Sequence, residues 1–95
     1  MKELETEFVG KGQTKGFKFT QIKKTKYGYI YEVSDLGVVW YEVFKRKENV
    51  RYLCISYPSN KSFGLWAWTT KNLERANEIL EDIDCLEYER LSNTF

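Results

Sequence analysis

A group of aromatic residues and two arginines are the side chains in this sequence best suited to binding a ligand. The group consists of Trp40, Phe44, Tyr57, Arg46 and Arg51, joined by Trp66 and Trp68. Aromatic planes stack on bases and guanidinium groups pair with phosphates, a combination typical of sheet surfaces that bind single strands. The same residue types dominate the energetics of protein–protein interfaces. Their pattern therefore predicts a binding surface and leaves its partner open.

Two carboxylates, Glu32 and Glu42, are expected beside these aromatic residues. As diagonal neighbours on one sheet face, their carboxyl groups would lie roughly 5–8 Å apart. That range overlaps the separation of the paired carboxylates of glycoside hydrolases. A short sheet offers no deep cleft, however, so we expect ion pairs with Arg46 and Arg51, or with a partner chain, rather than catalysis. Their negative charge would repel a polyphosphate backbone, which favours a protein partner.

Other kinds of chemistry find little support in the sequence. The chain contains no histidine, which removes Ser–His and Cys–His dyads and most metal sites. The glycine-rich loop over residues 10–16 has the glycine and lysine spacing of neither a P-loop nor a dinucleotide fingerprint. Cys54 and Cys85 fit no metal spacing and no disulfide framework. The sequence therefore predicts no enzymatic activity, no metal site and no cofactor.

The candidate residues must be positioned by strands, because residues 27–57 are rich in aromatic and β-branched side chains. Strands are expected over residues 3–9, 17–24, 27–33, 38–44, 51–57 and 63–68. A helix is expected from about residue 71 to 84, capped by Thr69-Thr70, with Leu73, Ala76, Leu80 and Ile83 on its apolar side. We therefore predict an α+β fold: a curled antiparallel meander of four to six strands, followed by one C-terminal helix packed on one sheet face.

Turn lengths fix which side chains share a face. We expect a three-residue loop at 35–37 and a two-residue turn at 48–49. One face would then hold Tyr27, Tyr29, Tyr31, Val33, Val39, Tyr41, Val43, Tyr52 and Cys54, and the other Ile30, Glu32, Val38, Trp40, Glu42, Phe44, Arg46, Arg51, Leu53, Ile55 and Tyr57. Because burying an unpaired charge costs far more than burying a tyrosine, the first face is expected beneath the helix.

A single helix, about 10 Å wide, cannot cover both faces of such a sheet. The Trp40 face therefore needs another cover, for which there are three alternatives: a second chain, a ligand, or the sheet curling on itself. We expect a curled sheet combined with a homodimer. This expectation depends on the turn lengths, since a slip of one residue exchanges the two faces.

Size and charge set the remaining bounds. The 95 residues are expected to form a single domain (1–95) with a net charge of +1. Charge is unevenly distributed, because residues 1–70 hold twelve Lys/Arg against seven Asp/Glu and residues 71–95 hold three against seven. No apolar stretch is long enough to span a membrane. The lack of an apolar signal core and the two unpaired cysteines predict a cytoplasmic protein.

Taken together, these features predict a small non-enzymatic binding module that acts through an aromatic-basic sheet face, as a homodimer with a protein partner. The alternative is a binder of nucleotides or single-stranded nucleic acid, in which rings stack the base and Lys or Arg meets the phosphates. Such a protein would sequester its ligand, as suits a protein of a phage or mobile element.

Overall fold

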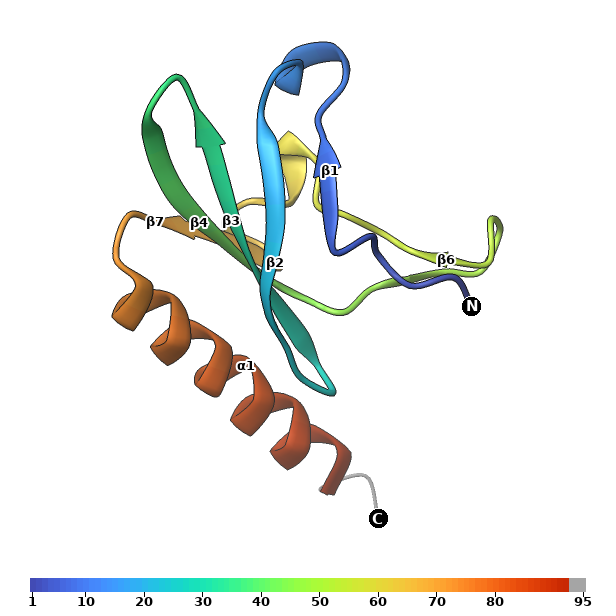
Figure 1. Cartoon of the computed structure of the whole chain (residues 1–95). Helices are drawn as coiled ribbons and strands as arrows, with labels where there is room; N and C mark the ends of the chain where they lie inside the picture. The colour runs from blue at the N-terminus through green and yellow to red at the C-terminus, as the bar shows by residue number, and fades with distance from the viewer. Residues whose placement is uncertain (93–95) are drawn as a thin grey trace.

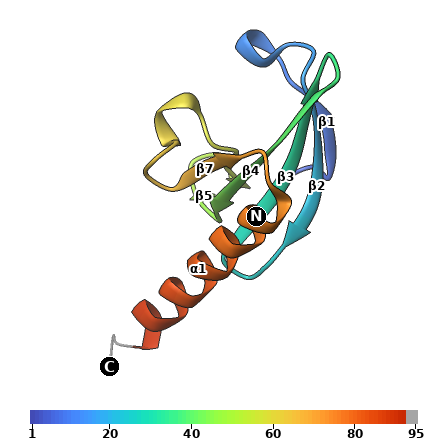
Figure 2. The same ribbon diagram turned by 90° about the vertical axis from the view of Figure 1, so that its left-hand side faces the viewer.

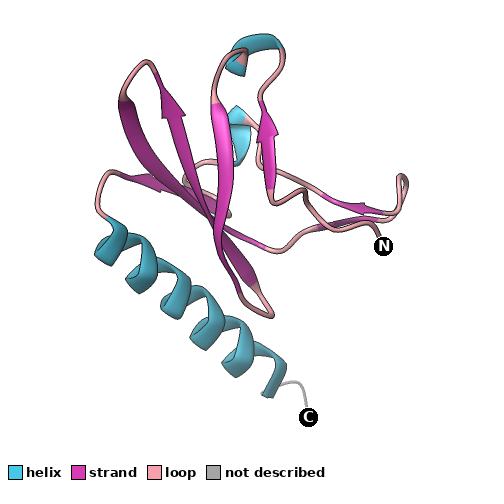
Figure 3. Ribbon diagram, viewed as in Figure 1, coloured by secondary structure: helices cyan, strands magenta, loops and turns pink. Residues whose placement is uncertain are grey.

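A five-stranded antiparallel sheet with one long helix against it makes up most of the computed structural model, which describes residues 1–92 (Figure 1). The sheet strands are β1 (Glu7–Val9), β2 (Lys18–Lys24), β3 (Gly28–Asp35), β4 (Val38–Lys45) and β7 (Ala67–Thr70), in the spatial order β1-β2-β3-β4-β7. The other elements are the ribbon β5 (Glu48–Asn49) and β6 (Cys54–Ile55), the 3₁₀ turns η1 (Gly12–Thr14) and η2 (Asn60–Ser62), and helix α1 (Leu73–Ser92). The α+β fold class, with a meandering sheet and a C-terminal helix, is confirmed (Figure 3).

The strand expected over residues 51–57 does not join this sheet. β4 pairs with β7 instead, which places Phe44 opposite Ala67 and Tyr41 opposite Thr70. The expected turn at 48–49 is itself a strand, β5, and the chain reverses over residues 50–53. There Asn49 Oδ1 accepts a hydrogen bond from the Tyr52 backbone N–H (3.2 Å), and Leu53 has a positive φ of 53°. Residues 46–66 therefore leave the sheet as an excursion.

The turn between β3 and β4 is one residue shorter than expected. Asp35 pairs with Val38, so the loop consists of Leu36 and Gly37 alone, both with positive φ (49° and 82°). A leucine rarely adopts that conformation, and this one is 96% exposed. The shift exchanges the faces of β3, because side chains alternate along a strand. Tyr29, Tyr31 and Val33 consequently share a face with Trp40, Glu42 and Phe44.

Helix α1 starts later and ends later than the sequence indicated. Asn72 caps it, since its Oδ1 accepts hydrogen bonds from the backbone N–H groups of Glu74 (2.8 Å) and Arg75 (3.2 Å). The expected cap residue Thr70 instead accepts from the Asn72 N–H (3.2 Å). No glycine or proline lies between residues 73 and 92, so nothing stops the helix at Asp84. Cys85, expected after the helix, therefore lies within it.

The helix packs on one face of the sheet through a narrow aliphatic contact. Ala76, Leu80 and Ile83 are buried against Ile30 of β3 and Val43 of β4. Gly28 allows this close approach, because a Cβ there would lie 2.7 Å from Leu80 Cδ1 and 2.9 Å from the Phe44 carbonyl oxygen. Of the tyrosine–valine set expected under the helix, Tyr27, Tyr41 and Val43 are there, whereas Tyr29, Tyr31 and Val33 lie on the opposite face.

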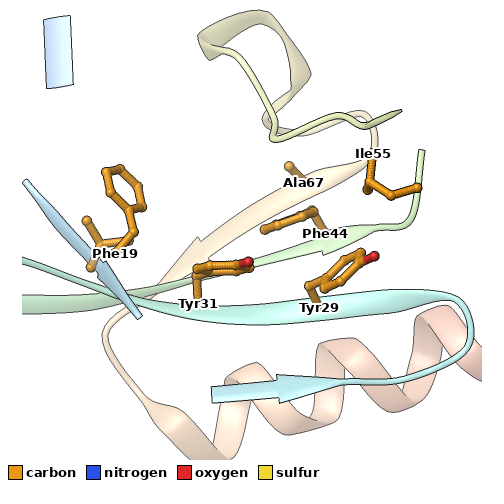
Figure 4. Packing of buried hydrophobic residues seen from close by; sticks show 7 residues of the cluster. Phe19, Tyr29, Tyr31, Phe44, Ile55 and Ala67 are labelled. Carbon is orange, nitrogen blue, oxygen red and sulfur yellow. The ribbon is translucent and has the colours of Figure 1, made fainter. Parts of the chain in front are cut away.

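The opposite face of the sheet, which we call the aromatic face, carries a cluster of aromatic rings. Other parts of the same chain cover this cluster. Figure 4 shows Phe19, Tyr29, Tyr31 and Phe44 on the side of the strands away from the helix. A β-bulge between Gln21 and Lys23 interrupts the β2–β3 register, and bulges increase strand twist. β1 and β2 turn away from the line of β4 and β7, so the sheet is curled (Figure 2). Of the three covers that the sequence left open, the structure therefore has a sheet that curls on itself.

Residues 53–63 of the excursion and the N-terminal segment complete this cover. Lys2 bridges Cys54 of β6, with hydrogen bonds from Lys2 N to Leu53 O (2.7 Å) and from Ile55 N to Lys2 O (2.8 Å). Leu4, Tyr57 and Phe63 pack against the cluster from the same side. Within residues 1–92, no helix is both long and apolar enough to cross a membrane.

Candidate functional site

Five of the nine residues singled out from the sequence lie together on the aromatic face. Trp40, Glu42 and Phe44 follow one another on β4, Arg46 comes directly after the strand, and Tyr57 packs over Phe44 with ring centroids 4.8 Å apart. Phe44 is fully buried and the other four are partly buried. The Trp40 face, expected to be the open face of the sheet, is therefore filled by the chain's own rings.

Of the other four predicted site residues, three lie elsewhere and Trp66 packs against the aromatic cluster. Glu32 is on the helix face, so it cannot pair with Glu42 across one face as expected. Trp68 also packs on the helix side. Arg51 is exposed in the turn of the β5–β6 ribbon, 5.4 Å from the ring centroid of Tyr52, and forms no salt bridge with Glu32 or Glu42. Trp66 packs edge-on against Phe44, with centroids 6.3 Å apart.

Each tyrosine hydroxyl of the aromatic face reaches a hydrogen-bond acceptor. Tyr29 donates to Glu3 Oε1 (2.9 Å), Tyr31 to the Glu5 carbonyl (2.6 Å) and Tyr57 to Glu42 Oε1 (2.7 Å). Burial, followed by the bond to Glu3, raises the pKa of Tyr29 to about 12. Burial and the neighbouring Glu42 charge raise the pKa of Tyr57 well above its usual range. These tyrosines are therefore neutral donors at physiological pH.

Glu3 forms an ion cluster that fastens the N-terminal segment to the end of the sheet. Both terminal nitrogens of the Arg46 guanidinium contact its carboxylate (Nη2–Oε2 2.7 Å, Nη1–Oε1 2.8 Å), and Lys24 Nζ lies 3.0 Å from Oε1. Arg46 and Lys24 together lower the pKa of Glu3 to about 2. Arg46 therefore serves the fold, and it does not point freely toward a ligand.

A hollow of about 740 Å³ lies between the N-terminal segment, β1 and the stretch from β6 to η2. We call it the aromatic hollow. Its lining includes Phe8, Phe19, Glu42, Cys54, Tyr57 and Phe63, with Lys2, Glu3, Glu5 and Lys11 among the exposed residues at its rim. Two predicted site residues, Glu42 and Tyr57, thus face a cavity rather than a flat surface.

A second hollow, of about 600 Å³, lies where the ends of β4 and α1 meet the β2–β3 turn. We call it the basic hollow. Its lining is Lys26, Tyr27, Lys45, Arg46, Lys47, Glu48, Trp66, Glu87, Arg90 and Leu91. Five cations face two carboxylates here, so the hollow has an excess of positive charge. Arg46 and Trp66 are the members that the sequence had singled out.

Two lysines of the basic hollow lie over aromatic rings instead of pairing with acids. Lys26 Nζ is 5.4 Å from the centroid of the Tyr27 ring, and Lys47 Nζ is 5.3 Å from that of Trp66. Neither ammonium forms a salt bridge within residues 1–92. Cation–π contacts at exposed positions are worth only about 0.5–1 kcal/mol. Both charges are therefore available to an anion.

Glu87 is the carboxylate that the basic hollow neutralises. Arg90 contacts its Oε2 through Nη2 (2.8 Å) and Nε (3.2 Å), and Lys45 Nζ lies 3.5 Å from Oε1. The bonds from Arg90, and then the charge of Lys45, lower the pKa of Glu87. Glu48 remains as an exposed carboxylate on the same hollow. No group of potential metal ligands gathers in the described part of the chain.

Most residues of the basic hollow were not predicted from the sequence. Lys26 and Tyr27 come from a turn, Lys45 and Lys47 from the end of β4 and the segment after it, and Arg90 from beyond the expected helix end. The cluster Lys45-Arg46-Lys47 beside Trp66 is the signal that could have indicated it. Arg90 could not be assigned to the hollow from the sequence, because α1 was expected to end at residue 84.

Comparison of the chain with protein-family models, with curated proteins and with solved structures finds no match. The two hollows are therefore the features of the molecule from which a function is inferred.

Proposed function

We propose that this protein is a non-enzymatic binding module whose basic hollow holds a ligand that combines an aromatic base with phosphate: a nucleotide, or the end of a single-stranded nucleic acid. The observation that carries the proposal is the pair of lysine–ring contacts, Lys26 on Tyr27 and Lys47 on Trp66, at the two sides of one hollow. Rings stack with bases and ammonium groups pair with phosphates.

The two contacts suggest how a ligand would be accommodated. A base that stacks on Trp66 or Tyr27 replaces the lysine over that ring, and the displaced ammonium turns toward the phosphate. The weak cation–π contact is thereby exchanged for a charge-assisted hydrogen bond, which is roughly twice as strong as a neutral one. Nothing in this exchange requires a nucleophile or a general base, so the proposed role is binding and sequestration.

The location of Glu42 also favours the nucleotide over the protein partner that the sequence suggested. Glu42 lines the aromatic hollow, away from the lysines of the basic hollow. Its charge therefore does not oppose a phosphate in the way expected when all these residues were placed on one face. The remaining opposing charge is Glu48, which is exposed and screened by water.

Titration with adenosine triphosphate and with a short single-stranded oligonucleotide tests the proposal. Trp66 fluorescence should be quenched on binding, and affinity should fall as salt increases. For the oligonucleotide, Lys26→Gln and Lys47→Gln should each reduce the slope of log K against log [salt] by about 0.7. Lys61→Gln, which removes an exposed lysine on η2 outside the hollow, is the matched control and should leave the slope unchanged.

Two results would count against a nucleotide site. Binding that the three variants weaken equally would indicate a diffuse charge effect. Quenching by inorganic triphosphate as strong as that by adenosine triphosphate would show that the rings contribute nothing, and would reduce the site to an anion site.

A second candidate function is protein binding as a homodimer. The tip of the β5–β6 ribbon carries Val50, Tyr52 and Leu53, which are 74%, 68% and 65% exposed, and it projects away from the sheet (Figure 1). Lysines on β2 and acids on α1 offer opposite charges, which favours a second copy as the partner. Light scattering at micromolar concentration should then give twice the monomer mass, and Tyr52→Ser should halve it. A monomer at low salt would exclude this candidate.

A further inference from the structure

The carboxylate of Glu42 has no cationic partner in the described structure. Its Oε1 accepts from Tyr57 Oη (2.7 Å) and its Oε2 from Trp40 Nε1 (3.1 Å), and both donors are neutral. No salt bridge within residues 1–92 includes it. A carboxylate withdrawn from water normally acquires a cation, because hydrogen bonds alone offset only part of the lost solvation. The uncompensated charge therefore points to a ligand.

Glu42 also differs from the other charged side chains of the aromatic hollow. Lys2, Glu3, Glu5 and Lys11 are exposed at the rim, where water screens their charges. Glu3 is moreover already paired with Arg46 and Lys24. Glu42 alone among the charged lining residues is partly buried. A ligand that enters the hollow consequently meets a negative charge at its inner side.

Aromatic rings packed at close range form part of the wall of the hollow. Phe8 stacks on Phe19 with centroids 4.6 Å apart, and Tyr57 meets both edge-on at 5.5 Å and 5.3 Å. Phe63 lines the same space. Ring faces attract cations through the aromatic quadrupole, and several rings with one carboxylate are the chemistry that recognises alkylated ammonium groups.

We propose that the aromatic hollow binds an alkylammonium group, with the cation near Glu42 and its alkyl substituents against Phe8, Tyr57 and Phe63. This site is separate from the basic hollow and has the opposite charge preference. Its volume of about 740 Å³ is within the range of small-molecule sites and leaves room for an apolar body attached to the ammonium group.

The first experiment uses the unmodified protein and two probes of matched shape. Choline carries a quaternary ammonium group, and 3,3-dimethylbutan-1-ol replaces its nitrogen with carbon and has no charge. Backbone amide shifts, followed by NMR during titration, should move at Phe8, Tyr57 and Phe63, with affinity about tenfold higher for choline. Equal affinity for the two probes, or shifts outside the lining residues, would overturn the proposal.

The second experiment tests the role assigned to Glu42. Glu42→Gln keeps an acceptor for one of the two neutral donors and removes the charge, so choline affinity should fall about tenfold while the affinity for the alcohol stays unchanged. Glu5→Gln removes an exposed rim carboxylate and is the matched control, for which no change is expected. If Glu42→Gln does not fold, as judged by thermal unfolding, the comparison of the two probes on the unmodified protein still tests the alkylammonium proposal.

Two further titrations separate related outcomes. A short peptide with trimethyllysine carries the same head group; tighter binding than choline would identify a protein side chain as its source, and weaker binding a free small molecule. Saturation with adenosine triphosphate should leave choline affinity unchanged, since the two hollows are distinct. The alkylammonium proposal therefore succeeds or fails independently of the nucleotide proposal.

Discussion

The two faces of the sheet are covered in different ways. The helix face is closed by an added element through a narrow aliphatic contact, centred on Ala76, Leu80 and Ile83. The aromatic face is closed by long side chains whose hydroxyls reach polar groups at its margin. Aliphatic contacts tolerate little water, whereas rings with a polar end can border it. Both hollows accordingly include residues of the aromatic face, and the basic hollow also includes residues of α1.

The largest expected effect is the loss of the central ring of the aromatic face. Phe44 is fully buried among Tyr29, Tyr31, Tyr57 and Trp66. Phe44→Ala should lower the free energy of unfolding by about 3–5 kcal/mol, because a large cavity remains. Urea denaturation measures this. Leu80→Ala on the helix face should cost about 2–5 kcal/mol; a loss below 1 kcal/mol for either variant would show that its face does not hold a core.

A smaller loss is expected when one polar end of the aromatic face is removed. Tyr57→Phe keeps the ring and deletes the hydroxyl that donates to Glu42. Hydrogen bonds to charged groups contribute about 1.5–3 kcal/mol, so stability in thermal unfolding should fall by that amount. Tyr88→Phe on the exposed side of α1 is the matched control and should have no measurable effect. A neutral outcome for Tyr57→Phe would mean that water replaces the donor.

The closeness of the helix contact can be tested at Gly28. Gly28→Ala places a methyl group against Leu80 and the Phe44 carbonyl, and should destabilise the protein by about 1–3 kcal/mol. In a Gly28→Ala/Leu80→Ala double variant, part of this cost should disappear, because the methyl group then has space. Strict additivity in denaturant unfolding would show that the helix already lies farther from β3.

The smallest effect is expected at the exposed ion cluster beside the aromatic face. Glu3→Gln removes a partly exposed pairing with Arg46 and Lys24, which is worth about 1 kcal/mol or less at neutral pH. The pKa of Glu3 is lowered to about 2 from 4.5. Its contribution is therefore present above pH 4.5 and is lost as the pH falls toward 2. The melting temperatures of the variant and the unmodified protein should converge over that interval; a constant difference would assign the effect elsewhere.

The elements that depend on local patterns were predictable from the sequence. Strands near β2, β3, β4 and β7, and the part of α1 up to Asp84, follow from aromatic and β-branched runs and from one apolar stripe. The shared face of Trp40, Glu42 and Phe44 follows from simple alternation along one strand. The position of Tyr57 over that face was also expected, although it reaches the face from outside the sheet.

Features set by tertiary context were not predictable. Glycine at position 37 suits a two- or a three-residue loop, and the shorter loop requires Leu36 at positive φ, which local preference disfavours. The pairing of β4 with β7, rather than with residues 51–57, depends on distant packing. Each of these two errors assigned a whole row of side chains to the wrong face or to the wrong sheet. The basic hollow was missed because its members come from four separate parts of the chain.

The bridge from Lys2 to residues 53–55 has a consequence for how the protein forms. Lys2 is synthesised before its backbone partners Leu53 and Ile55, which follow some fifty positions later in the chain. Before the N-terminal segment is held in place, the hydroxyl groups of Tyr29 and Tyr31 lack their hydrogen-bond acceptors in that segment, and the aromatic rings of β2 are exposed to water. Such non-local closure is slow and leaves apolar surface exposed to neighbouring molecules. A chain shortened to begin at Thr6 should therefore aggregate during refolding, even though every strand of its main sheet is intact.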